Sequence, residues 1–244
     1  MAQKIRLDVL IFKRGLVPSI TKSTAFIMEG KVTVDGKIIT KPGFAVSETS
    51  EISIKESAEF VSRGGIKLKK VLEEFSVCVK DKICLDVGAS TGGFTDCLLK
   101  NGAKKVYSVD VSYGVFDFKL RNNPQVVNIE KTNIRYFDKN LLKDEIDLAV
   151  VDVSFISLEK VLPKVKELVK KGGEIIVLVK PQFEAPKGST QKGVVKDEKI
   201  RLLAIDKIKD FSETLGLKLL GETPSPIKGP KGNLEHFLYL KKSN

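Results

Sequence analysis

The stretch that decides the fold reads Leu85-Asp86-Val87-Gly88-Ala89-Ser90-Thr91-Gly92-Gly93-Phe94. An apolar run that begins at Ile83 ends in a carboxylate, then in glycines and small residues, and a helical pattern follows. This order is typical of a strand that turns sharply into a helix around a nucleotide-like ligand. The sequence therefore predicts an α/β fold with a cofactor site at the carboxyl end of this strand.

The glycine spacing separates two classes of cofactor. The tract has no Gly-x-Gly pair, which disfavours the dinucleotide-binding loop of an NAD-dependent dehydrogenase. S-adenosylmethionine has no pyrophosphate and suits this spacing better, with Asp86 in the mouth of the turn supplying negative charge near the methionine ammonium. Asp110 ends the next short strand and can accept hydrogen bonds from both ribose hydroxyls. We expect a cofactor site that contains Asp86, Gly88, Ala89, Ser90, Thr91, Gly92, Gly93, Phe94 and Asp110. The alternative, a tight turn that binds nothing, leaves two carboxylates at successive strand ends without a reason.

The composition indicates a globular protein with a polyanionic partner. The chain has 244 residues and is 42% hydrophobic, enough for one ordinary domain plus a small module. Its 42 Lys and Arg against 31 Asp and Glu give a net charge of +11, which favours nucleic acid. We find no apolar signal core and no run of bilayer length, so we expect a cytoplasmic protein without a membrane partner. One histidine and three cysteines without Cys-x-x-Cys spacing indicate neither a metal site nor a disulfide framework.

The first 57 residues predict a small α+β module. One helix is expected over 6–14 and a second from a Ser19 cap to Glu29, each followed by glycine. Short strands over 31–34 and 37–39 flank Asp35-Gly36, a pair favoured in tight hairpin turns. The module carries basic residues on its helices, although a helical cap with a solvated charged face would show the same pattern.

The rest of the chain predicts a doubly wound, seven-stranded, Rossmann-like sheet. Strands are expected over 83–88, 105–110, 126–130, 146–152, 173–180, 217–223 and 234–241, and helices over 66–75, 158–169 and 197–215. The final two strands have no helix between them. The last strand should therefore insert antiparallel into an otherwise parallel sheet.

Four polar residues suggest a catalytic site at one edge of this sheet. Asp152 and Lys180 end the fourth and fifth strands, Glu235 begins the antiparallel last strand, and Lys67 lies on the entering helix. Two lysines and two carboxylates beside a sulfonium fit methyl transfer to a weakly acidic hydroxyl such as a ribose 2′-hydroxyl. We expect Lys180 to act as the base or as a fixed charge, with Asp152 and Glu235 orienting it. The alternative is a set of ordinary ion pairs at a domain edge.

Two resemblances extend these expectations. The motifs Ser19-x-Thr21-Lys22-Ser23-x-Ala25 and Gly30-x-Val32-x-Val34 resemble the αL RNA-binding module of a small-subunit ribosomal protein (S-four), pseudouridine synthases and tyrosyl-tRNA synthetases. That resemblance implies binding of structured RNA, mainly through phosphates and shape. The RNA-binding residues expected here are Arg6, Lys13, Arg14, Lys22 and Arg63.

Almost the whole chain resembles the haemolysin A (TlyA) family. The motifs are Ser62-Arg63-Gly64-Gly65-x-Lys67-Leu68, the glycine-rich tract, Asp152-Val153-Ser154-Phe155-Ile156-Ser157, Lys180-Pro181-Gln182-Phe183-Glu184 and Gly232-Asn233-x-Glu235. The resemblance implies an S-four-like module over 1–57, a linker over 58–65 and an FtsJ-like methyltransferase domain over 66–244. It implies S-adenosylmethionine as cofactor, ribosomal RNA or ribosomal subunits as partner, and 2′-O-methylation of cytidine in 23S rRNA, with 16S rRNA as a second candidate substrate.

The same resemblance places the family's catalytic tetrad on Lys67, Asp152, Lys180 and Glu235, and brings Asn133 near the adenine. Two other functions remain open. A pore-forming haemolysin would match the family's name, but this sequence offers no evident route into a bilayer. A catalytically inactive RNA-binding protein of ribosome assembly would match the fold, but the intact tetrad argues against it.

Overall fold

The computed structural model describes residues 4–55 and 59–243, and the chain divides into two compact units, residues 1–58 and 59–244. Ala58, the first residue of the expected linker, lies outside the described residues.

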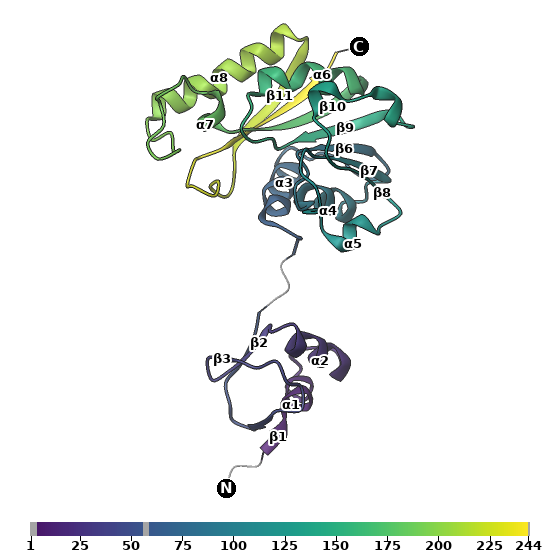
Figure 1. Cartoon of the computed structure of the whole chain (residues 1–244), viewed down its shortest axis with the longest axis vertical. Coiled ribbons are helices and arrows are strands. Elements are labelled where there is room, and N and C mark those ends of the chain that lie inside the picture. Colours follow the sequence, from purple (N-terminus) through teal and green to yellow (C-terminus); the bar gives the residue numbers. More distant parts are fainter. Residues whose placement is uncertain (1–3, 56–58, 244) are drawn as a thin grey trace. The chain divides into compact units, whose positions relative to one another are not determined.

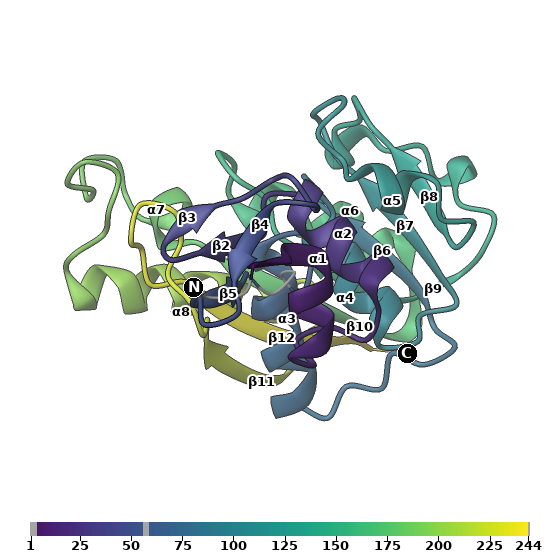
Figure 2. The same ribbon diagram turned by 90° about the horizontal axis from the view of Figure 1, so that it is seen from below.

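The first unit is a small α+β module. Its elements are β1 (Lys4–Arg6), α1 (Leu7–Lys13), α2 (Ile20–Met28), β2 (Val32–Val34), β3 (Lys37–Ile38), β4 (Ala45–Ser47) and β5 (Ile52–Ile54). The two helices lie side by side (Figure 2), and their apolar faces pack with strand residues around Leu7, Ile11 and Ile27. Ser19 caps α2 as predicted, because its Oγ accepts the Lys22 N–H at 3.1 Å. The predicted helices and hairpin are confirmed.

Three short strands of the module were not predicted. β1 pairs with β4, and β5 pairs with β2 in a three-stranded sheet of order β3-β2-β5. Each of these strands has three residues, and β1 finds its partner some forty residues away, where Lys4 lies opposite Ser47. So short a run shows too little alternation for a strand to be recognised from the sequence.

The second unit contains a seven-stranded sheet of order β11-β12-β10-β9-β6-β7-β8. Its strands are β6 (Ile83–Val87), β7 (Lys105–Val109), β8 (Val126–Ile129), β9 (Ile146–Val151), β10 (Val169–Val179), β11 (Leu217–Pro224) and β12 (His236–Lys242). The five neighbouring strands β10, β9, β6, β7 and β8 pair in parallel, whereas β12 is antiparallel to both β10 and β11. This confirms the predicted doubly wound sheet with an antiparallel last strand. β10 starts earlier than predicted, since Val169 pairs with Ile146 before an irregularity in register.

Helices cover both faces of this sheet. The α-helices are α3 (Arg63–Glu74), α4 (Gly93–Lys100), α5 (Phe118–Arg121), α6 (Leu162–Leu168), α7 (Pro181–Glu184) and α8 (Glu198–Thr214), and the 3₁₀ turns are η1 (Ile134–Tyr136), η2 (Lys139–Leu141) and η3 (Leu158–Lys160). Figure 1 shows α6 and α8 on one side of the sheet and α3 and α4 on the other, and each side has its own apolar core. Fully buried residues such as Leu68 and Ile208 each stabilise these layers by about 1.5 to 3 kcal/mol.

The sheet register fixes which side chains meet. Val87 of β6 lies opposite Val151 of β9, so Gly88 and Asp152 follow at neighbouring strand ends. Val179 of β10 lies opposite His236 of β12, so Lys180 leaves β10 where Glu235 enters β12. The carboxyl ends of the parallel strands and the start of the antiparallel strand therefore share one edge, where open α/β sheets bind ligands.

Candidate active site

A cavity of about 620 Å³ opens at this edge. Of the residues predicted from the sequence, the cavity is lined by Arg63, Lys67, Gly88, Ala89, Ser90, Thr91, Gly93, Phe94, Asp152, Lys180 and Glu235. All four members of the predicted tetrad are therefore brought together: Lys67 from α3, Asp152 and Lys180 from the positions that follow β9 and β10, and Glu235 from the position before β12.

The tetrad forms two ion pairs. The Lys67 ammonium contacts Glu235 Oε2 at 2.5 Å, and both side chains are at most 9% exposed. The Lys180 ammonium pairs with Asp152 and also donates to Ser154 Oγ at 2.9 Å. We expected both carboxylates to orient Lys180, but Glu235 binds Lys67 instead. Burial explains this arrangement, because an ammonium withdrawn from water requires a counter-charge at hydrogen-bond distance.

The glycine-rich loop brings its backbone close to the next strand. Gly88 has φ of +85°, and a Cβ at this position would overlap the carbonyl oxygen of Asp152. Only glycine fits both the left-handed backbone and the close approach. Asp110 supports the same loop from β7: its Oδ2 accepts the Ser90 N–H at 2.7 Å, and its Oδ1 accepts the Ser112 N–H at 2.7 Å. Asp110 thus orders the loop but does not line the cavity itself.

Asp86 lies beneath the loop and not in its mouth. Its side chain is fully buried, and its Oδ2 accepts the Thr95 hydroxyl at 2.6 Å. Burial raises the pKa of Asp86 to about 7. Among the described residues, its Oδ1 has no hydrogen-bond partner, and the same holds for Oε1 of Glu235. Of these two residues, Glu235 lines the cavity, and a buried carboxylate oxygen without a donor suits a ligand with a positive charge, which fits S-adenosylmethionine.

Four predicted cofactor residues lie outside the cavity lining: Asp86, Gly92, Asp110 and Asn133. Gly92 precedes α4 with φ of +93°. Asn133 accepts the Arg135 N–H at 3.1 Å and so caps η1. Its contact with adenine stays a prediction, as does the ribose contact of Asp110.

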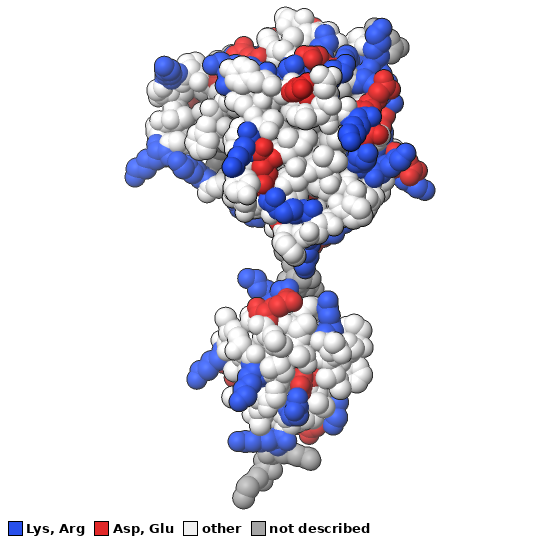
Figure 3. Space-filling view, turned by 45° about the vertical axis from the view of Figure 1, so that its right-hand side comes forward, with Lys and Arg blue, Asp and Glu red and all other residues white. Residues whose placement is uncertain are grey.

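The predicted RNA-binding residues differ in how firmly they are held. The Arg6 guanidinium makes a two-point contact with the buried Asp8, at 3.1 and 2.6 Å, and holds the pKa of that carboxyl below its usual range. The Arg14 guanidinium donates to the carbonyl oxygens of Ser50 and Glu48. Lys13 and Lys22 are exposed on the module's helices, whereas Arg63 lines the cavity of the other unit. On the face shown in Figure 3, basic side chains are scattered over both units with acidic ones among them.

The structure adds cavity residues that the sequence did not single out. Phe155 is 91% exposed, has φ of 62°, and its ring lies 5.2 Å from that of Phe183. Gln182 also lines the cavity. All three residues lie within the two motifs that contain Asp152 and Lys180. Their position in these motifs was the sequence signal that could have marked them as site residues.

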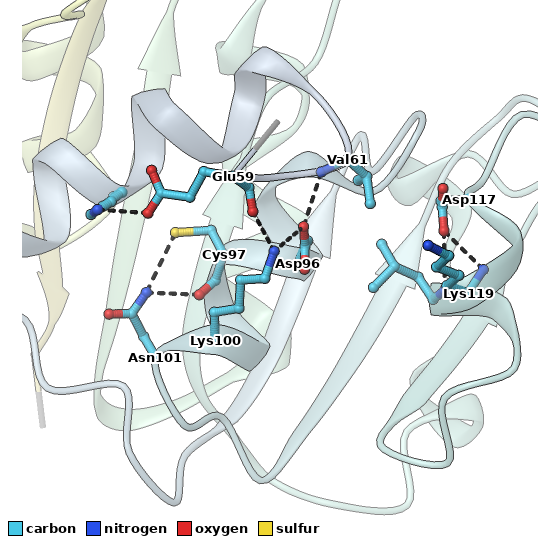
Figure 4. Close-up of polar contacts among 10 residues, drawn as sticks. Glu59, Val61, Asp96, Cys97, Lys100, Asn101, Asp117 and Lys119 are labelled. Atoms are coloured by element: carbon cyan, nitrogen blue, oxygen red, sulfur yellow. Dashed lines mark hydrogen bonds and ion pairs between the residues drawn. The ribbon is translucent and has the colours of Figure 1, made fainter. Parts of the chain in front are cut away.

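Residues 59–62 belong to the second unit and are fixed to α4 (Figure 4). The Val61 N–H donates to Asp96 Oδ2 at 2.9 Å, and the Lys100 ammonium contacts both Asp96 and the carbonyl oxygen of Glu59. Ser62 then caps α3, with its Oγ accepting the Gly64 N–H at 3.3 Å. This cap starts the helix at Arg63, three residues before the predicted start, inside the segment expected as linker.

The sequence matches the models of two known protein families. Residues 60–242 match the family model of the FtsJ-like methyltransferases, and residues 5–52 match that of the S4 domain. The chain belongs to the FtsJ-like methyltransferase family. This FtsJ-like methyltransferase thus combines the catalytic fold with an S4 domain, as predicted.

Several relatives match the chain over both of its units. The chain is 41% identical over 244 residues to the 16S/23S rRNA (cytidine-2′-O)-methyltransferase TlyA of Mycobacterium tuberculosis, covering 99% of this chain and 91% of the relative. It is 43% identical over 242 residues to Hemolysin A of Brachyspira hyodysenteriae, covering 97% and 99%. A solved structure described as a hemolysin from Streptococcus thermophilus shares 38% identity and a TM-score of 0.76, covering 100% of this chain and 90% of that one. The predicted resemblance to the haemolysin A (TlyA) family is confirmed.

No helix within residues 4–55 and 59–243 has the length and hydropathy needed to cross a bilayer. In the same ranges, no group of three or more His, Cys, Asp or Glu side chains is arranged to hold a metal ion.

Proposed function

We propose that this FtsJ-like methyltransferase transfers a methyl group from S-adenosylmethionine to the ribose 2′-hydroxyl of a cytidine in 23S rRNA, with 16S rRNA as a second substrate. The observation that carries the proposal is the meeting of two lysine–carboxylate ion pairs beside a glycine-rich loop in one cavity. The substrate named for the Mycobacterium tuberculosis relative supports the choice of nucleotide.

The chain's own residues divide the work of cofactor binding. The backbone of Gly88 to Gly93 forms the cradle, and Asp110 keeps this loop in place through Ser90. Glu235 offers an unpartnered carboxylate oxygen at the cavity wall, where it would face the positive charge of the ligand, while Asp86 lies buried beneath the loop. When bound, S-adenosylmethionine supplies an electrophilic methyl group.

Methyl transfer to a hydroxyl requires that the hydroxyl lose its proton. A ribose 2′-hydroxyl is a weak acid, so the developing negative charge on oxygen must be stabilised or its proton removed. The Lys180 side chain, held by Asp152 and Ser154, lies at the cavity wall: its ammonium form would stabilise that charge, and only its neutral amine form would accept the proton. Lys67 adds a second buried positive charge, which Glu235 holds in place.

The S4 domain binds RNA and takes no part in the chemistry. The exposed side chains of Lys13, Arg14 and Lys22 offer positive charge to phosphates, whereas the charge of Arg6 is balanced within the module by Asp8. We infer that the protein acts on ribosomal RNA or ribosomal subunits in the cytoplasm.

Methylation of rRNA by purified protein tests this function. Purified 23S and 16S rRNA, and the corresponding subunits, are incubated with isotopically labelled S-adenosylmethionine, and the products are mapped by resistance of the modified ribose to alkaline cleavage. A label on a cytidine 2′-oxygen supports the proposal. A label on a base, or no label on any of the four substrates, overturns it.

A further inference from the structure

Glu184 is a buried carboxylate without a role in the site described so far. Its side chain is 1% exposed. Its Oε1 accepts the Leu158 N–H at 2.7 Å, and its Oε2 accepts the Ser157 hydroxyl at 2.6 Å. The Lys207 ammonium lies 3.9 Å from the same oxygen. Burial raises the pKa of this carboxyl above its usual value, so the hydrogen bonds are made in a place that disfavours the charge.

These hydrogen bonds join the two segments that carry a catalytic ion pair. Asp152 begins the loop that follows β9, and this loop ends at Ser157, the cap of η3. Lys180 precedes α7, and Glu184 is the last residue of that short helix. The Lys180–Asp152 pair therefore connects the two segments at one end, and the Glu184 contacts connect them at the other.

The loop between the two connections adopts a conformation that needs support. Phe155 has φ of 62°, in the left-handed region that bulky residues rarely occupy. Ser154, its neighbour, accepts the hydrogen bond from Lys180 at 2.9 Å. Releasing the far end of the loop would let Phe155 return to an ordinary conformation, and Ser154 and Asp152 would move with it.

We propose that Glu184 is a positioning residue for methyl transfer: by fixing the far end of loop 152–157 to α7, it sets where Asp152 and Ser154 hold the Lys180 ammonium. The inference rests on the proposed function of the tetrad and adds a fifth side chain to it. Glu184 itself faces the protein interior and not the substrate.

Four variants separate positioning from plain stabilisation. Glu184→Ala removes both contacts. Glu184→Gln keeps them in neutral form, because its amide oxygen can accept from Leu158 and its amide nitrogen can donate to the Ser157 hydroxyl. Ser157→Ala removes one contact from the loop side. Glu159→Ala is the matched control, since Glu159 contacts the same Ser157 hydroxyl at 3.3 Å and the same Lys207 at 2.6 Å, but is 37% exposed.

The experiment measures single-turnover methylation at saturating rRNA and S-adenosylmethionine, the affinity for each, the pH dependence of the rate, and the melting temperature. We expect Glu184→Ala to lower the single-turnover rate by ~10- to 100-fold, the scale of a displaced catalytic group. Both affinities should stay within ~2-fold of the parent, and the midpoint of the pH–rate profile should move. Glu184→Gln should recover most of the rate, Ser157→Ala should lose part of it, and Glu159→Ala should match the parent in rate and in pH profile.

Three results would overturn the inference. One is a Glu184→Ala rate within ~2-fold of the parent. Another is a loss of rate that is matched by the loss of folded protein or of S-adenosylmethionine affinity. The third applies if Glu184→Ala does not fold: a fully active Ser157→Ala then decides against positioning. A parent protein that methylates no rRNA would instead contradict the proposed function, so the two failures are distinguishable.

Discussion

At the residue scale, Lys180 carries the sharpest prediction. Replacement by alanine should lower turnover by ~100-fold or more, the scale of a lost acid–base or oxyanion group, because the 2′-oxygen then loses the group that takes its proton or balances its charge. Binding of S-adenosylmethionine, measured by calorimetry, and of RNA, measured by filter binding, should stay near the parent's. Near-parental single-turnover rates would leave Lys180 as a structural partner of Asp152.

Lys180→Arg distinguishes the two roles open to this lysine. A guanidinium keeps the positive charge but does not release its proton at working pH. If Lys180 is a base, the arginine variant should be as slow as the alanine variant; if it acts as a charge, part of the rate should return.

The raised pKa of Asp86 predicts that the stability of the protein depends on pH. Its pKa is about 7 in the folded protein against an ordinary value of 3.8, so the folded state keeps a proton that the unfolded chain releases between those values. The free energy of unfolding of the cofactor-free protein should therefore fall as the pH rises from about 4 to 7, by up to ~4 kcal/mol from this group. Urea unfolding at several pH values measures the slope, and Asp86→Asn should flatten it. An equal slope in the variant would contradict the assignment.

At the element scale, Gly88 holds the end of β6 against the end of β9. Alanine there must adopt φ of +85° and overlap the Asp152 carbonyl, so Gly88→Ala should lower the free energy of unfolding by ~1 to 3 kcal/mol and weaken S-adenosylmethionine binding. Gly114→Ala is the matched control, because Gly114 has φ of +75° but nothing within 4 Å of an added Cβ. Thermal melts and calorimetry of the two variants separate the steric overlap with Asp152 from backbone strain. An equal loss of stability in both variants would exclude a contribution of that overlap.

Most elements of the large sheet could be predicted from the sequence, but the contacts between them could not. The strands of the large sheet and the antiparallel β12 were predictable, because each is a run of apolar residues between turn signals. The strand ends then placed Asp152, Lys180 and Glu235 at one edge. The pairing of Glu235 with Lys67 was not predictable, since it depends on how α3 packs, and neither was the burial of Asp86 by the loop that follows it. The hydrogen bonds of Glu184 to Ser157 and Leu158 were not predictable either, because these segments come close only when β9 and β10 pair.

At the scale of the whole molecule, the proposed function assigns RNA binding to the first unit and methyl transfer to the second. Removing residues 1–58 should abolish rRNA methylation while S-adenosylmethionine still binds the remaining unit, because the described residues that line the cavity run from Ser62 to Glu235. Affinity of the intact protein for RNA should fall steeply with added salt, since neutralised phosphates release counterions. Full activity of the shortened protein on rRNA would refute this division.

The Lys67–Glu235 ion pair joins positions 168 residues apart in the chain. Lys67 is among the first residues of its unit to be made by the ribosome, and Glu235 stands just before β12, the last strand of that unit in chain order. A growing chain on the ribosome therefore holds Lys67 without its counter-charge until β12 has been released and has inserted between β10 and β11. We therefore expect a prematurely stopped chain that lacks β12 to be inert, however well its earlier strands have folded.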